Sequence, residues 1–296
     1  MAKVDIGVAC APHQTKNWWS PVMAMLLGEQ EYGNAEIGKI HATSSASPDH
    51  NKNHVVSSSP WNAEEKRRGD LTDANRGAVA GTFLDGDADY LFFMDDDTVP
   101  PKGVISHLIG LGRELVGGVY FNTKPPYNPI AYYRREDGLY SAVYDYVHGS
   151  LLPVDSMGMG CTLIHRSVFE RIQSGHTLFQ RPNGSILVVK NEGVVTVGAR
   201  EWDMGRGGSL VLTDGERFVF GQDVRRLPNE DDNRAWPFFA MEYGRTEDHH
   251  FCELAQSVGI QPYLDTAVTC AHWKYRATGR KEYRKAELQA REVRGD

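Results

Sequence analysis

Short apolar runs alternate with helix-like stretches over the first 121 residues of the chain. The apolar runs are rich in β-branched and aromatic residues, a composition that predicts strands. Four strands are predicted here: Val4–Cys10, Glu36–Thr43, Asp89–Met94 and Leu115–Phe121. Three helices are predicted: Trp18–Leu27, Leu71–Leu84 and one that opens at Pro100–Pro101. This alternation predicts an α/β fold with a mostly parallel sheet flanked by helices.

The pattern changes after the next predicted strand, Val154–His165, and its helix, Arg166–Gln173. Residues 174–235 hold short β-like runs between Asn-Gly, Glu-Gly and Asp-Gly turns, which predicts a β-hairpin-rich insertion. Its predicted strands are Ile186–Lys190, Val194–Val197, Ser209–Leu212 and Arg217–Phe220. A helix is predicted again at Glu247–Val258, and a long polar loop is predicted at 44–62.

The composition is that of a globular protein with a substantial core. The 296 residues are 41% hydrophobic, and their net charge of −7 argues against a protein that coats nucleic acid with its whole surface. The four cysteines are far apart and lack C-x-x-C spacing, so neither a zinc ribbon nor a disulfide scaffold is expected. No apolar run approaches the roughly 18 residues that span a bilayer, and no leader-like segment precedes Val4. We therefore expect a soluble cytoplasmic protein without a membrane partner.

Three aspartates, Asp95, Asp96 and Asp97, follow directly after the apolar strand that ends at Met94. Carboxylates at a strand end lie at the edge of an open α/β sheet where ligands bind. Adjacent carboxylates repel one another unless a cation neutralises them, and Mg²⁺ or Mn²⁺ prefers oxygen ligands. Side chains two residues apart can project the same way, so Asp95 and Asp97 can share one metal ion. The alternative is a solvated loop that caps the next helix.

The residues around this acidic run resemble the donor-binding half of a GT-A fold glycosyltransferase. Residues 83–101, FLDGDADYLFFMDDDTVPP, carry the family's DxD motif. The preceding helix bears Arg76, as in the family, although the family usually has Arg-Asn where this chain has Arg76–Gly77. The resemblance implies an enzyme that binds a nucleotide-sugar donor together with Mn²⁺ or Mg²⁺.

The second half of the chain agrees with this resemblance. Val154–Ile164 resembles the strand that lines the sugar pocket, where Gly158 and Gly160 would let the backbone approach a ligand closely. Gly160 could instead relieve crowding against a neighbouring helix. Glu247–Asp248 resembles the acidic motif that opens the acceptor-side helix, and His272 stands where the family has its metal-binding histidine. The resemblance runs from about residue 4 to residue 273 and is interrupted by the insertion.

The family's pattern implies roles in donor binding. Asp95, Asp97 and His272 would hold the metal ion, and Asp96 would face the ribose of the donor, for which a UDP-sugar is the default. The other residues expected to contact the donor are Pro12, Arg76, Lys124, Gly158 and Gly160. Taken alone, Lys124 could equally be a solvated surface lysine, and His272 a hydrogen-bonded histidine in a corner between a strand and a loop.

The acidic pair at the start of the predicted helix is the expected catalytic pair. Asp248 would act as general base on the acceptor hydroxyl, and Glu247 would orient or bind the acceptor. This assignment presumes an inverting transfer of a hexose-type sugar. Both acids could also serve simply to cap the helix, because negative charge is favourable near a helix N-terminus.

The organisation expected from these features has four parts. Residues 1–173 form the nucleotide-sugar-binding half of the GT-A domain, and 174–235 form the insertion on the acceptor side. Residues 236–273 form the acceptor and catalytic half of the same domain, and 274–296 form a charged tail.

The acceptor is the least defined part of the prediction. The compact form without a membrane anchor resembles glycosyltransferases encoded by bacteriophages, so a hydroxymethylated pyrimidine in DNA is the favoured acceptor, in the cytoplasm of the host. A glycan or protein acceptor remains open, as does a sugar nucleotidyltransferase or a carbohydrate-binding protein without activity. A nucleotidyltransferase would normally have a Gly-rich basic loop after its first strand, and Ala9–His13 contains none.

Overall fold

The structure of the chain is a computed structural model. It describes residues 1–10, 25–26, 29, 35–44, 75–123, 125–180, 186–190, 194–195, 210–211, 225–226, 236–240, 245–274, 276–278 and 284. Among the helices in these ranges, none has both the length and the apolar character needed to cross a membrane.

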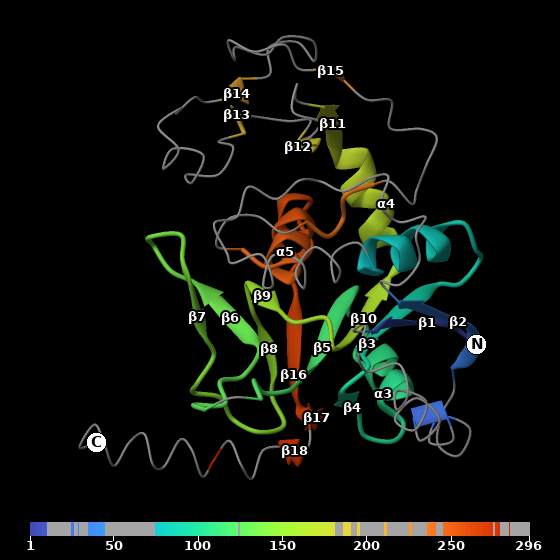
Figure 1. Cartoon of the computed structure of the whole chain (residues 1–296), viewed down its shortest axis with the longest axis vertical. Helices are drawn as coiled ribbons and strands as arrows, with labels where there is room; N and C mark the ends of the chain where they lie inside the picture. Colours follow the sequence, from blue (N-terminus) through green and yellow to red (C-terminus); the bar gives the residue numbers. More distant parts are fainter. Residues whose placement is uncertain are drawn as a thin grey trace.

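A seven-stranded sheet forms the centre of the molecule (Figure 1). In spatial order its strands are β2 (Glu36–Ser44), β1 (Lys3–Cys10), β3 (Tyr90–Asp95), β10 (Cys161–His165), β5 (Leu115–Val119), β16 (Tyr263–Thr269) and β8 (Leu151–Pro153). Five of the seven point the same way, while β10 and β8 run against their neighbours. The chain is therefore an α/β protein with a mixed sheet whose majority of strands is parallel.

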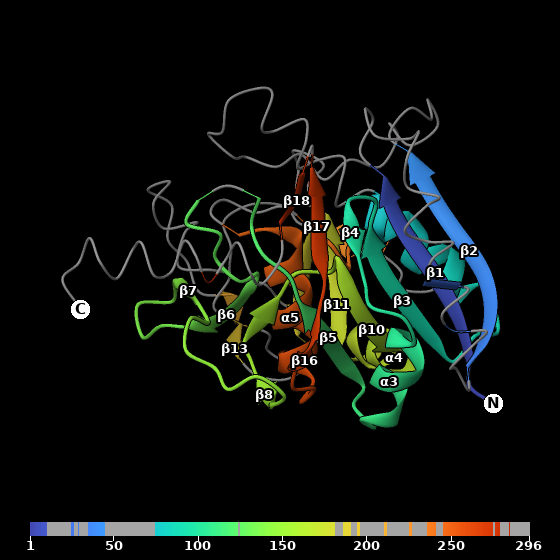
Figure 2. The ribbon, with the colours of Figure 1, turned by 90° about the horizontal axis from the view of Figure 1, so that it is seen from below.

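Helices cover both faces of this sheet. Helix 75–84, α4 (Arg166–Gly175) and α5 (Glu247–Ser257) pack on one face, and α3 (Val104–Gly110) packs on the other (Figures 1 and 2). Strand β3 supplies both layers by alternation: Leu91 and Phe93 belong to the first core cluster, Phe92 and Met94 to the second. Burial on both faces explains why this strand is apolar at every position from Leu91 to Met94.

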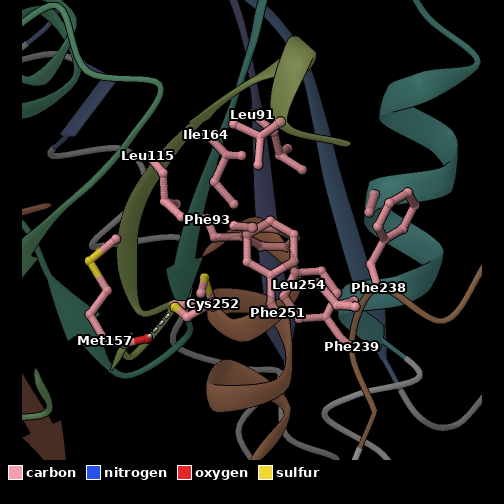
Figure 3. Packing of buried hydrophobic residues seen from close by; sticks show 14 of the residues in the cluster. Leu91, Phe93, Leu115, Met157, Ile164, Phe238, Phe239, Phe251, Cys252 and Leu254 are labelled. Atoms are coloured by element: carbon pink, nitrogen blue, oxygen red, sulfur yellow. Dashed lines mark hydrogen bonds between the residues drawn. The ribbon is translucent and has the colours of Figure 1, made fainter. Parts of the chain in front are cut away.

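The first core cluster is rich in aromatic rings, which come from the strands, the helices and the segment 236–240 (Figure 3). Phe239 stacks on Phe251 of α5 with ring centroids 4.8 Å apart, and its edge meets Phe93 of β3 at 5.4 Å. Phe238 packs against Phe169 of α4 at 5.1 Å. Segment 236–240 thus packs against α4, α5 and the central sheet together.

Smaller sheets lie around the central one. One contains β6 (Ala131–Arg134), β7 (Tyr140–Ala142) and β9 (Ser156–Met157), and another contains β4 (Thr98–Val99), β17 (Ala271–Lys274) and β18 (Arg276–Thr278). Short strands in the region of the predicted insertion are β11 (His176–Gln180), β12 (Ile186–Lys190), β13 (Val194–Val195), β14 (Leu210–Val211) and β15 (Arg225–Arg226).

Two predicted elements differ from the observed ones. The predicted strand Val154–His165 is two strands, β9 and β10, separated by a turn at 158–160. The helix predicted to open at Pro100 begins at Val104, after the short strand β4. The predicted strand Arg217–Phe220, most of helix Trp18–Leu27 and the loop after Ser44 lie outside the described residues.

Candidate active site

Arg76 lies at the centre of a buried group of charged side chains beside the carboxyl end of β3. Its guanidinium donates from Nη2 to Asp95 Oδ1 at 2.7 Å and from Nη1 to Glu247 Oε1 at 2.6 Å. Nη1 also forms an ion pair with Asp248 Oδ1. The Arg76 side chain is 4% exposed and those of its three partners are 9–22% exposed. We call Arg76, Asp95, Glu247 and Asp248 the charged cluster.

Three elements far apart in the sequence bring this cluster together. Asp95 continues the alternation of Leu91 and Phe93, so its side chain lies on the face that helix 75–84 and α5 cover. Arg76 projects from helix 75–84, and Glu247 and Asp248 occupy the first turn of α5. Acidic side chains are favourable at that end of a helix, so their place in the first turn is compatible with their ion pairs with Arg76.

The charges of the cluster do not balance. One guanidinium faces three carboxylates, which leaves a net charge of −2 when all three are ionised. Burial raises the pKa of Asp248 well above its ordinary value; Arg76 opposes this rise, and Glu247 and Asp95 add to it. Burial raises the pKa of Glu247 as well. The cluster therefore favours either a bound proton or an additional cation.

Gly158 and Gly160 form the turn between β9 and β10, beside the cluster. A Cβ atom at Gly160 would lie 2.6 Å from Asp95 Oδ2 and 3.0 Å from Thr98 Oγ1. The backbone N–H of Gly160 donates to the hydroxyl of Tyr120 at 3.0 Å, and a side chain at Gly158 would collide with the same hydroxyl. Both glycines are thus required for the close approach of this turn to Asp95 and Tyr120.

The acidic run and His272 lie next to each other in the backbone. Asp96 and Asp97 are half-buried between β3 and β4. Strand β17 pairs with β4 so that His272 is opposite Thr98, the residue after Asp97. His272 and the acidic run are therefore neighbours in strand register, although the two segments are far apart in the sequence.

The oxygen atoms beside Gly160 fit a divalent cation in kind. Thr98 is fully buried, and its Oγ1 has no hydrogen-bond partner among the described residues. Asp95 Oδ2 lies beside the same glycine, and the surrounding charge is negative. Among the side chains that the structure describes, however, no group of three His, Cys, Asp or Glu residues is arranged to hold a metal ion. Asp95 Oδ1 is instead bonded to Arg76.

Of the residues predicted for the site, Arg76 contacts Asp95, Glu247 and Asp248 directly, and Gly160 borders Asp95. Pro12 and Lys124 lie outside the described residues. Gly77 stands where glycosyltransferases of the GT-A type usually have an asparagine. A Cβ atom at Gly77 would meet nothing within 4 Å, so a side chain would fit at this position.

Sequence reasoning missed Tyr120 and Thr98. Tyr120 is 3% exposed, and burial raises the pKa of its phenol well above the ordinary value, with Asp95 and Asp248 adding to the rise. The signal that could have found it is its place directly after β5, since β5 and β3 point the same way and end at the same edge of the sheet.

Comparison with known proteins adds little to this geometry. No protein-family model matches the chain, and no curated protein matches it. Among solved structures, the crystal structure of A197 from STIV is similar at 15% sequence identity and a TM-score of 0.43, over 95% of this chain and 92% of that one. A similarity of this size supports no conclusion about function.

Proposed function

We propose that the chain is a metal-dependent glycosyltransferase of the GT-A type, which moves a sugar from a nucleotide-sugar, by default a UDP-sugar, to an acceptor hydroxyl. The observation that carries the proposal is the charged cluster. Arg76 bonds on one side to Asp95, the first residue of the DxD motif, and on the other to Glu247 and Asp248. The candidate donor-binding residue Asp95 and the candidate acceptor-side residues Glu247 and Asp248 therefore share one buried guanidinium, that of Arg76.

The metal would be held by Asp95, Asp97 and His272. A bound Mn²⁺ or Mg²⁺ would stabilise the negative charge that develops on the diphosphate leaving group. The excess negative charge of the cluster and the buried Thr98 Oγ1 support a cation at this end of β3. Arg76 is the fixed cation of the same region, and its forked guanidinium suits phosphate oxygens as well as carboxylates.

Asp248 would take the proton of the acceptor hydroxyl while that oxygen attacks the anomeric carbon and the bond from the sugar to the diphosphate breaks. A general base works best when its pKa approaches the working pH. Burial raises the pKa of Asp248 in that direction, whereas an exposed aspartate would be a weaker base. Glu247, on the same helical turn and the same guanidinium, would hold Arg76 and the acceptor in place.

The test is release of nucleoside diphosphate from UDP-sugars by the purified chain in Mn²⁺, with hydroxymethylated DNA and with neutral oligosaccharides as acceptors. Asp248→Asn removes the base and should lower kcat by about 100-fold or more. Asp95→Asn should abolish the stimulation by Mn²⁺. Asp87→Asn is the matched control, because the Asp87 side chain is 78% exposed and pairs with Lys3 at the surface.

Three outcomes would overturn the proposal. Full turnover by Asp248→Asn would refute the assignment of Asp248 as general base. Turnover that depends neither on Mn²⁺ nor on the carboxylate of Asp95 would refute the metal-dependent mechanism. Release of pyrophosphate in place of nucleoside diphosphate would identify a nucleotidyltransferase, the competing enzyme class.

A further inference from the structure

The sheet of β6, β7 and β9 presents tyrosines beside α5. Tyr132 of β6 pairs with Ser156 of β9, and Arg134 of β6 pairs with Tyr140 of β7. Because alternate residues of a strand share a face, Tyr132 and Tyr140 lie on the same face of this sheet. Their rings are 6.4 Å apart in an edge-to-face arrangement. We call this sheet, with the following segment 143–147, the tyrosine sheet.

The tyrosine sheet is fixed to α5 by several contacts. The ring of Tyr140 stacks on His249 with centroids 4.0 Å apart and an interplanar angle of 5°. Its hydroxyl donates to Glu253 Oε1 at 2.7 Å. His249 Nδ1 lies 2.6 Å from Ser156 Oγ, and the edge of Tyr132 meets the same imidazole at 4.8 Å. These contacts hold the tyrosines in a defined position relative to α5.

His249 directly follows Asp248, so this attachment sets the tyrosines next to the proposed general base. The pKa of Tyr132 is raised to about 12 by burial first, and then by the charges of Asp248 and Tyr144. Tyr132 thus contacts the imidazole that follows Asp248 along α5, and the charges of Asp248 and Tyr144 both act on the pKa of its phenol.

Large exposed hydrophobic side chains are concentrated in residues 133–147. Apart from Met1, every large hydrophobic side chain that is strongly exposed among the described residues lies there: Tyr133 (40%), Leu139 (42%), Tyr144 (49%) and Val147 (76%). Tyr133 lies on the face of β6 opposite to Tyr132, whereas Tyr144 and Val147 follow β7. Clusters of exposed apolar groups next to a polar site mark ligand-binding surfaces more often than chance surface residues do.

The charges of this region disfavour a polyanionic ligand. Residues 131–157 contain two basic residues, Arg134 and Arg135, and four acidic ones, Glu136, Asp137, Asp145 and Asp155. A surface that binds nucleic acid needs a surplus of Lys and Arg to neutralise phosphates. A tyrosine offers a flat apolar face and a hydroxyl, which suit the C–H face and the hydroxyl groups of an uncharged sugar ring.

We propose that the tyrosine sheet is the acceptor-binding surface of the chain and that it binds a neutral oligosaccharide. Tyr144 would stack on a sugar ring near the surface, and Tyr132 would guide the acceptor toward Asp248. This inference rests on the proposed function, because it gives that function its acceptor class. It places the acceptor on β6 and β7, whereas the sequence had directed attention to the insertion at 174–235.

Binding of the full chain to an array of neutral oligosaccharides, without donor or metal, tests this inference independently of turnover. Tyr144→Ala should raise the Kd for the bound oligosaccharides by about 3- to 10-fold, and Tyr144→Phe should keep most of the affinity. Tyr133→Ala is the matched control, because alternation turns Tyr133 to the other side of β6 from Tyr132 and its exposed fraction is similar. A 20-base-pair duplex that contains hydroxymethylcytosine serves as the competing probe.

Absence of oligosaccharide binding across the array would overturn the inference. Equal losses in Tyr144→Ala and Tyr133→Ala would overturn the location, and tighter binding of the duplex than of any oligosaccharide would assign DNA as the acceptor instead. Tyr144-dependent binding without any consumption of nucleotide-sugar would overturn the proposed enzymatic function and support the binding surface. Turnover with hydroxymethylated DNA that is unchanged in Tyr144→Ala would support the enzymatic function and overturn the binding surface.

Discussion

At the scale of single residues, Arg76 is a buried cation that pairs with three carboxylates. Burial alone would lower the pKa of its guanidinium, but Asp248, Asp95 and Glu247 together raise that pKa well above the ordinary value. The arginine therefore remains charged, and the carboxylates depend on it. A buried ion pair adds little net stability, but the loss of one partner costs much more, because an uncompensated charge stays inside.

Replacement of Arg76 by Met should lower the free energy of unfolding by about 3–5 kcal/mol. The loss should be larger at pH 8 than at pH 5, because the carboxylates left behind can bind protons at the lower pH. Urea denaturation of both proteins at the two pH values measures this. Arg135→Met removes an exposed pair with Asp137 and should cost less than about 1 kcal/mol. Equal losses in the two variants would show that Arg76 is not the counter-ion of the cluster.

His249 gives a prediction about pH. Burial first, and the charge of Arg245 second, lower the pKa of this imidazole to about 4. The folded chain therefore holds His249 neutral at a pH where the unfolded chain binds a proton, so the stability that this group contributes is complete above about pH 6.5 and falls as the pH drops toward 4. The lost stability should reach about 2–3 kcal/mol at the lower end of this range.

The measurement for His249 is the free energy of unfolding at several pH values between 7 and 4, in the original chain and in His249→Phe. Phenylalanine can still pack against Tyr140 but cannot take up a proton. The variant is expected to lose stability less steeply with acid. Parallel pH profiles would mean that His249 is protonated equally in both states.

At the scale of elements, the positions of the strands were easier to predict than the side of the sheet that each residue faces. Leu91, Phe92, Phe93 and Met94 predict a buried strand because all four are apolar, but the same uniformity hides which side of the sheet each residue faces. Only the packing of helix 75–84 and α5 reveals that Asp95 lies on their side. The break at 158–160 was also hidden, because it depends on the contact of the glycines with Tyr120, a residue of a different segment.

Arg166, the first residue of α4, fastens helix 75–84 to the sheet. Its guanidinium donates to four main-chain carbonyls, those of Phe83, Leu84, Gly86 and Ala88, at 2.8–3.1 Å. It also lies over the ring of Phe83, 4.5 Å from the centroid. These bonds satisfy carbonyls at the end of helix 75–84 and in the loop that follows it, and the Phe83 carbonyl also accepts from the N–H of Gly86.

Arg166→Lys should lower the free energy of unfolding by about 1.5–3 kcal/mol, because an ammonium group cannot reach four carbonyls that a forked guanidinium bonds together. The midpoint of guanidinium chloride denaturation measures the change. Arg171→Lys on the same helix is the control, since its pair with Glu114 is 43–45% exposed. A loss in Arg171→Lys as large as that in Arg166→Lys would contradict the role given to Arg166.

At the scale of the whole molecule, the site is a product of topology. Arg76, Asp95, Glu247 and Asp248 were foreseen as site residues from their motifs, but their mutual ion pairs join helix 75–84, β3 and α5, and no local pattern contains that contact. Tyr120 and Tyr132 were missed because each is one tyrosine among 13 until the fold sets it beside an acidic side chain. Sequence patterns identify strand ends well, whereas the partners across them emerge only from the fold.

The most direct test of the central claim is a crystal structure with UDP and Mn²⁺, in which the anomalous scattering of manganese locates the metal. The account predicts one manganese peak at the end of β3, with Asp95, Asp97 and His272 around it, the diphosphate beside it, and Arg76 turned from Asp95 toward the phosphates. A manganese peak elsewhere, or a charged cluster that stays closed on itself while UDP binds at another surface, would contradict the account.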